Sequence, residues 1–197
     1  VPVLADPDLN CLTFIKPFAL VDATLAKRNL GIYKDMAPVV IGVGPGFCAG
    51  IDCHAVIESM RGHDLGRVIY NGKAKENTGI PGDIMGFTKQ RVVYAPESGV
   101  IELVNNIGDL VETNQTIAKI SSCMVKAPIS GVLRGMIRNN YQVKKGMKIA
   151  DVDPRGVIEY CHTISDKARA IGGSVLEVLM HFKNFPLEVQ NLENPTA

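Results

Sequence analysis

The sequence predicts an α+β protein, in which a mixed α/β part is joined to an all-β part. Three observations support this fold class. Residues 37–47 form an apolar run that ends in a glycine-rich turn, residues 93–152 contain an internal repeat, and residues 163–181 form an amphipathic segment with helical spacing. We expect the front of the chain and the last helix to form the α/β part, and the repeat to form the β part.

The composition excludes several functional classes. The chain has 197 residues, 46% of them hydrophobic, and its 21 basic and 20 acidic side chains leave a net charge of +1. This balance gives no electrostatic footprint for nucleic acid. The longest uncharged stretch, residues 36–51, is too short and too rich in Gly and Pro to span a bilayer, so we expect no membrane partner. Five cysteines without a C-x-x-C pair favour a reducing, cytoplasmic setting.

The front of the chain offers two features suited to an anion. Leu20 and Val21 predict a buried strand that ends at Asp22, and a small polar cluster follows at residues 27–29. A solvated basic turn is an equally weighted alternative for this cluster. Residues 37–43 then predict a second strand, and residues 44–49 satisfy G-x-G-x-x-A, a pattern that lets backbone amides approach a phosphate group. A glycine turn that merely reverses the chain is the favoured alternative, because Pro45 removes one amide donor.

Chemically capable side chains are concentrated in residues 48–64. His54 and Glu58 are four residues apart and share a face in either a helix or a strand, which would suit a general acid/base pair or, with Cys53, a metal site. A structural hydrogen bond is the commoner role for such a pair. No spaced set of metal ligands is present, and we therefore predict no metal site.

The middle of the chain contains a repeat with an offset of 32 residues. Residues 93–120 align without a gap on residues 125–152, with nine identical positions that include an A-P-x-S-G-V motif in each half. Short β-branched runs separated by Pro and Gly predict small antiparallel strands. Because one half alone would expose its apolar face, we expect two halves related by a pseudo-twofold to form a flattened β-sandwich.

Residues 91–153 resemble the barrel-sandwich hybrid of biotinyl and lipoyl carrier domains. In those domains a lysine at the tip of a hairpin between the halves carries the acyl group. The link at residues 120–128 is too short for that hairpin, and Lys119 and Lys126 both fall inside predicted strands. We therefore expect a structural β-sandwich and no biotin or lipoate.

The last helix is predicted within residues 163–181. Ser165 is suited to the N-cap, with Asp166 in the first turn. The expected apolar stripe consists of Ala168, Ile171, Val175, Leu176 and Leu179. Two consecutive glycines, Gly172 and Gly173, weaken a helix by about 1 kcal/mol each relative to Ala, so we expect another backbone or a ligand to approach there.

The order of long motifs along residues 20–180 resembles the YqeB-type family. The matching motifs are Asp22-Ala-x-x-Ala-Lys27-Arg-Asn29, Gly44-Pro-Gly-Phe47-x-Ala-Gly50-x-Asp52-x-His54, Arg61-Gly-His-Asp-Leu-Gly-Arg67, Asn77-Thr-Gly-Ile-Pro-Gly82, Asp153-Pro-Arg155 and residues 163–173. The resemblance implies an accessory protein of the selenium-dependent molybdenum hydroxylase system, related to xanthine and purine dehydrogenases. It also implies a Rossmann-like region with a glycine-rich motif ahead of Val1, so we interpret this chain as a fragment.

The expected domain organisation follows from these elements. The five segments are 1–36, the remnant of a Rossmann-like α/β domain; 37–88, a glycine-rich α/β segment with the candidate site; 89–156, the biotinyl/lipoyl-like sandwich; 157–183, a helix packed on the α/β part; and 184–197, a tail.

Two hypotheses of different class follow for function. The first is a maturation factor that binds a small anionic ligand, an unidentified cofactor or the apo-hydroxylase. The second is an enzyme acting on a small anionic molecule, with a histidine as acid/base and Arg28 or Arg61 as the anion clamp. The catalytic candidates are Cys53, His54 and His63. The ligand-binding candidates are Lys27, Arg28, Asn29, Gly44, Gly46, Asp52, Arg61, Asp64, Asp166, Lys167 and Arg169. It stays open whether Cys161 and His162 meet Cys53 and His54.

Overall fold

The computed structural model describes residues 1–184 and has the predicted α+β character. The chain separates into two compact units, which are described separately. The first contains residues 1–78 and the described residues from 166 onward, and the second contains residues 79–165. Most of the expected tail, 185–197, lies outside the described residues. Among those residues, no helix has the length and apolar character needed to cross a bilayer.

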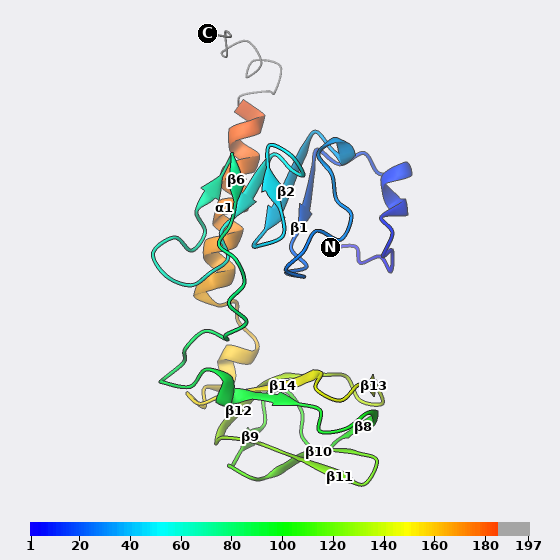
Figure 1. The fold of residues 1–197 in the computed structure, drawn as a ribbon, viewed down its shortest axis with the longest axis vertical. Helices are drawn as coiled ribbons and strands as arrows, with labels where there is room; N and C mark the ends of the chain where they lie inside the picture. The colour runs from blue at the N-terminus through cyan, green and yellow to red at the C-terminus, as the bar shows by residue number, and fades with distance from the viewer. Residues whose placement is uncertain (185–197) are drawn as a thin grey trace. The chain divides into compact units, whose positions relative to one another are not determined.

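The first unit is organised around a mostly parallel four-stranded sheet in the order β1-β2-β4-β5 (Figure 1). β1, β2 and β4 are parallel to one another, and β5 is antiparallel to β4. A separate two-stranded sheet pairs β3 with β6. The strands are β1 (Ala19–Asp22), β2 (Val39–Val43), β3 (Cys48–Ala49), β4 (Ala55–Ile57), β5 (Val68–Ile69) and β6 (Gly72–Lys73). The predicted strands at Leu20–Asp22 and in the apolar run before Gly44 are therefore confirmed as β1 and β2.

The sheet is covered on both faces, which explains why β2 is apolar at every position. On one face, α1 (Asp166–Asn184) packs through Val178 and Phe182 against Ile41 and Ile57. A second cluster, which includes Phe47, Cys53 and Val56, lies on Val40. Short 3-10 helices at Asn10–Thr13 and Lys34–Met36 complete this unit.

The predicted helix is confirmed, but two details of it are wrong. It begins at Asp166, directly after Ser165. Ala168 and Leu176 of the expected stripe are exposed, and the buried positions include Ser174, Val178 and Phe182. Nothing lies within 4 Å of a Cβ added at Gly172 or Gly173. The close approach occurs instead at Ser174. Its hydroxyl donates to the Gly66 carbonyl at 2.5 Å and to the Ala170 carbonyl, one turn earlier in the helix, at 2.8 Å.

The second unit contains two open four-stranded sheets, in the orders β11-β10-β8-β13 and β7-β14-β12-β9. Their inner faces share one apolar core built around Ile101, Ile117 and Leu133. The strands are β7 (Val92–Tyr94), β8 (Gly99–Leu103), β9 (Leu110–Val111), β10 (Thr116–Ile120), β11 (Cys123–Lys126), β12 (Gly131–Met136), β13 (Gln142–Val143) and β14 (Lys148–Asp153). Further 3-10 helices lie at Lys89–Arg91 and Ile158–Cys161.

The two sheets have matching strand positions. Three pairs of strands, β8 and β12, β9 and β13, and β10 and β14, each begin 32 residues apart and occupy equivalent places in the two sheet orders. Lys119 lies in β10 and Lys126 in β11, and only residues 121 and 122 connect these two strands.

Candidate functional site

Several candidate residues lie where the parallel strands of the first unit end. Because β1, β2 and β4 are parallel, their carboxyl ends meet at one edge of the sheet. Asp22 ends β1, Gly44 follows β2 and Glu58 follows β4. Open α/β sheets bind ligands at this edge. We call it the carboxyl edge.

The glycine turn after β2 touches the loop after β1 backbone to backbone. Gly46 has a φ of 110°, and a Cβ there would lie 2.5 Å from the Arg28 Cα, which leaves no room for any side chain. The turn continues into strand β3 and not into a helix. The G-x-G-x-x-A pattern therefore lacks the strand-turn-helix context of a dinucleotide fingerprint, as the favoured alternative expected.

Two polar side chains hold the loops of the carboxyl edge in shape. Glu58 is buried, and its two carboxylate oxygens accept the backbone N–H groups of Met60 at 2.7 Å and Lys75 at 2.8 Å. Asn29 donates to the Ile32 carbonyl at 2.8 Å and accepts the N–H groups of Gly31 and Ile32. Both are positioning residues, since their polar atoms are used within the fold.

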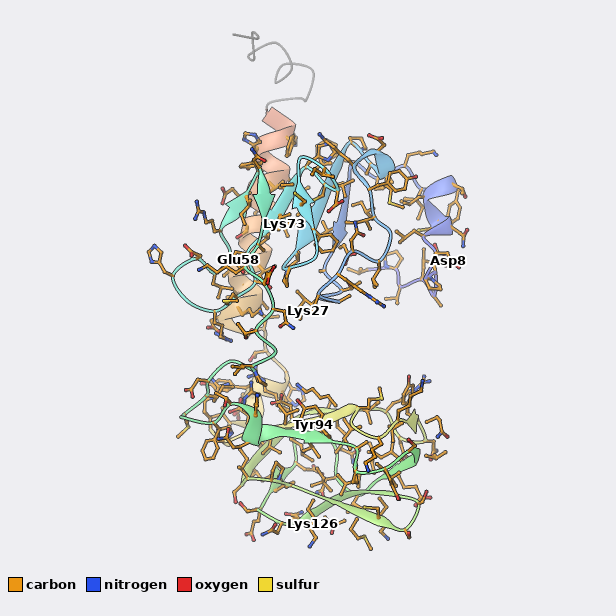
Figure 2. All side chains as sticks on the ribbon, viewed as in Figure 1. Asp8, Lys27, Glu58, Lys73, Tyr94 and Lys126 are labelled. Atoms are coloured by element: carbon orange, nitrogen blue, oxygen red, sulfur yellow. The ribbon has the colours of Figure 1, made fainter. Side chains whose placement is uncertain are left out.

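Lys167, in the first turn of α1, adds a half-buried cation to this edge. Burial lowers the pKa of Lys167, the positive charges of Lys27 and Arg61 lower it further, and the Glu58 carboxylate raises it. These interactions involve residues from the loop after β1, the loop after β4 and the helix, and Figure 2 shows Lys27 and Glu58 near the same end of the unit. The result is a local excess of positive charge.

The cations of the carboxyl edge differ in their partners. The Arg61 guanidinium makes a two-point ion pair with the Asp166 carboxylate, with Nη2 and Oδ1 2.9 Å apart. Within residues 1–184, by contrast, neither Lys27 nor Lys167 has an ion pair or a side-chain hydrogen bond. The half-buried Lys167 ammonium lacks an ion-pair partner, which is costly, and an external anion would relieve that cost.

The other predicted ligand-binding residues have structural partners or lie on the surface. Asp52 accepts the Cys48 N–H at 2.8 Å inside a tight turn. Asp64 is paired with Lys75 at 2.5 Å, and this contact lowers the pKa of Asp64. Arg28, Arg169 and the catalytic candidate His63 are exposed.

The predicted pair of His54 and Glu58 does not form. His54 precedes β4 and accepts the Val40 N–H on Nδ1 at 2.9 Å, whereas Glu58 follows β4 at the opposite edge of the sheet. Cys53 is fully buried, and burial raises the pKa of its thiol to about 11, which keeps it protonated near neutral pH. Among the residues that the structure describes, no group of three or more His, Cys, Asp and Glu could hold a metal ion.

Two further residues near the candidate residues were not among the predicted ones. Ser59 is buried beside the glycine turn, with its Oγ 2.6 Å from the position of a Cβ on Gly44. Its place two residues after the end of β4 is a signal in the sequence that could have pointed to it. Lys34 lies close enough to His54 to affect its titration, and no sequence pattern indicates this. Cys161 lies in the second unit, where its Sγ contacts the Leu133 carbonyl at 3.7 Å.

Comparison with known proteins identifies one informative relative. No family model matches the chain. The chain is 53% identical over 180 residues, or 91% of its length, to the "Uncharacterized protein YqeB" of Escherichia coli (strain K12). It spans about a third of that protein's length, 33%.

Two solved structures have weak likeness to the chain. They are the ectoine utilization protein EutE (DoeB) from Ruegeria pomeroyi and a succinylglutamatedesuccinylase/aspartoacylase from Rhodobacter sphaeroides. The first has a TM-score of 0.29 and 18% identity, and the match covers 43% of this chain and 27% of that one. The second has a TM-score of 0.30 and 17% identity, with coverage of 59% and 45%. TM-scores this low do not indicate a shared fold.

Proposed function

We propose that this chain, whose similarity to YqeB supports a place in the YqeB family, is part of an accessory protein for maturation of a selenium-dependent molybdenum hydroxylase. In this proposal its first unit binds a small anionic ligand or cofactor at the carboxyl edge, and the apo-hydroxylase is the partner. The hydroxylase role rests on the motifs that resemble the family. The binding role rests on the geometry of the edge.

One observation carries the binding role: Lys27 and Lys167 converge on the carboxyl edge, where neither makes an ion pair with any of the described residues. The aligned peptide dipoles of α1 add positive potential near Lys167. Arg61 adds to this positive electrostatic potential, although its ion pair with Asp166 neutralises much of the Arg61 charge. An anion smaller than a dinucleotide suits this edge, because Pro45 lacks an N–H and no helix follows the glycine turn.

An enzyme with a histidine acid/base is less well supported as an alternative. His54 and the Arg61 clamp would have to act on one substrate, yet they lie at opposite edges of the sheet. His63 is exposed, whereas a general base is usually held near its substrate by surrounding groups.

Removing either unpaired lysine is expected to weaken anion binding. The 197-residue chain can be titrated calorimetrically with inorganic phosphate and with molybdate as probes. We expect K27M and K167M each to weaken binding about tenfold, the effect of losing one charge-assisted contact worth about 1.4 kcal/mol. K73M is the matched control, because Lys73 is exposed on β6 and is not among the charges that act on Lys167, and the affinity of this variant should be unchanged. Equal affinities in all four proteins would refute the carboxyl-edge site.

The accessory role has a separate test in cells. A strain that lacks the full-length protein should lose most of its selenium-dependent hydroxylase activity while still producing the hydroxylase polypeptide. Wild-type full-length protein should restore the activity, and protein carrying K167M should restore less. Full hydroxylase activity in the deletion strain would exclude the accessory role and leave the anion site standing.

For the second unit we propose a barrel-sandwich hybrid made of two copies of one 32-residue motif. The support is that three strand pairs begin 32 residues apart and occupy equivalent places in the two sheets. A structural role is proposed, without biotin or lipoate. Its support is that Lys119 and Lys126 are strand residues, and that residues 121 and 122 leave little space for a projecting lysine.

In the first unit, the parallel β1, β2 and β4 with α1 on one face support the proposed Rossmann-like remnant.

A further inference from the structure

A concave site lies at the other edge of the first unit's sheet. A pocket of about 720 Å³ opens between the segments that precede β1 and β2, with His54 from the start of β4 in its wall. Since the three strands are parallel, this is their amino edge, opposite the proposed anion site. The volume lies in the range typical of pockets for small organic molecules.

The ring of His54 has a defined orientation and protonation state. Its Nδ1 accepts the Val40 N–H at 2.9 Å, so the proton of the neutral imidazole is on Nε2, which is therefore a donor. The ring packs edge-on against Phe182, with the centroids 5.7 Å apart. Burial lowers the pKa of His54, the charge of Lys34 lowers it further, and Asp35 opposes that effect. The neutral donor form is consequently favoured near neutral pH.

Lys34 gives the pocket a half-buried positive charge. Its side chain has no ion pair or hydrogen bond with any residue from 1 to 184. Lys16 adds a second, exposed ammonium that donates to the Leu12 carbonyl at 3.3 Å, and Asp35 is an exposed carboxylate. The polar lining thus has one net positive charge beside a fixed N–H donor.

The remaining wall is apolar and unlike a phosphate cradle. Ile15, Phe18 and Met36 line it, and Ile15 and Phe18 are 43% and 50% exposed although both are large hydrophobic side chains. A doubly charged inorganic anion gains nothing from such a wall. A ligand with one anionic group and an apolar body would satisfy both parts of the pocket.

We propose that this pocket binds a small monocarboxylate, with its carboxylate between the Lys34 ammonium and His54 Nε2–H and its apolar body against Ile15, Phe18 and Met36. The site is independent of the carboxyl edge and of any hydroxylase partner. It also gives His54 a binding role in place of an acid/base role.

The proposal is tested by NMR titration of the 197-residue chain. The His54 ring resonances are identified by their loss in H54Q, and the probes are acetate, butyrate, hexanoate and inorganic phosphate. We expect saturable shifts of the His54 ring with affinity rising by up to about fourfold per added methylene, the factor that corresponds to about 0.8 kcal/mol of buried CH₂. Phosphate should bind more weakly than hexanoate.

A lysine variant separates the proposed site from general anion binding. K34M should weaken hexanoate binding about tenfold, with backbone amide spectra that show the fold intact, and K73M should bind as the wild type does. The proposal is overturned if hexanoate causes no saturable shift at His54, if its affinity does not exceed that of acetate or phosphate, or if K34M binds it equally well.

Discussion

G46A is expected to lower the free energy of unfolding of the first unit by at least about 3 kcal/mol. The φ of 110° at Gly46 alone costs a side-chain-bearing residue about 1–3 kcal/mol. The added Cβ would also meet the Arg28 backbone, with Cα at 2.5 Å and N at 2.6 Å, and backbone atoms cannot move aside as a flexible side chain would. Hydrogen exchange measured by mass spectrometry on the full 197-residue chain would report the loss of protection in residues 1–78.

A second glycine distinguishes the cost of a positive φ from the cost of a steric clash at the added Cβ. Gly50 has a φ of 88°, yet nothing lies within 4 Å of its added Cβ. G50A should therefore cost only about 1 kcal/mol, and it should bind phosphate as the wild type does. G46A should lose phosphate binding, because the loop it displaces carries Lys27. Equal destabilisation by the two variants would mean that the contact with Arg28 contributes nothing.

Local patterns in the sequence identified β1, β2 and α1 of the first unit, but not its short strands β3 to β6. The β-branched run at Val39–Val43 and the polar start at Ser165 and Asp166 sufficed for β2 and for the beginning of α1. The buried face of α1 was misjudged because Ser174 interrupts its apolar pattern. Its hydroxyl is satisfied by the carbonyls of Gly66 and Ala170, a long-range contact that periodicity cannot reveal.

The assembly of the candidate site was predictable only in part. The ends of the predicted strands were enough to locate Asp22 and the glycine turn, because the direction of parallel strands determines which edge of the sheet holds their carboxyl ends. The approach of Lys27 to Lys167 depends on how α1 packs on the sheet, and nothing local in the sequence contains that information. The same limit applies to His54 and Glu58: spacing determines the face of a strand, but the ends of a three-residue strand lie at opposite edges.

D153A is expected to destabilise the second unit by about 3 kcal/mol. The Asp153 side chain is 1% exposed, and its carboxylate accepts Arg155 Nε at 2.9 Å, Arg155 Nη2 at 2.6 Å and Arg134 Nη1 at 3.1 Å. The Tyr160 ring lies 4.6 Å from the Arg155 guanidinium carbon and 5.9 Å from that of Arg134. Removing the carboxylate breaks the ion pairs that Arg134 and Arg155 both make with Asp153, and breaking buried pairs costs about 3–5 kcal/mol. Hydrogen exchange within residues 79–165 measures the loss.

The same carboxylate gives the second unit an acid-sensitive component of stability. Hydrogen bonding from Arg155 chiefly lowers the pKa of Asp153 below its ordinary 3.8, and burial opposes that effect. Because the folded-state pKa is the lower one, the contribution is complete above about pH 5 and is lost as the pH falls through 3.8 toward the folded-state pKa. Wild type should therefore lose stability between about pH 5 and pH 2 more steeply than D153N, which has no charge to titrate there.

E102A is the control, since Glu102 is exposed on β8 and should change stability by less than about 0.5 kcal/mol. If D153A proves no more destabilising than E102A, the arginine pairs do not stabilise the fold, and packing in the shared core must hold the end of β14 in place.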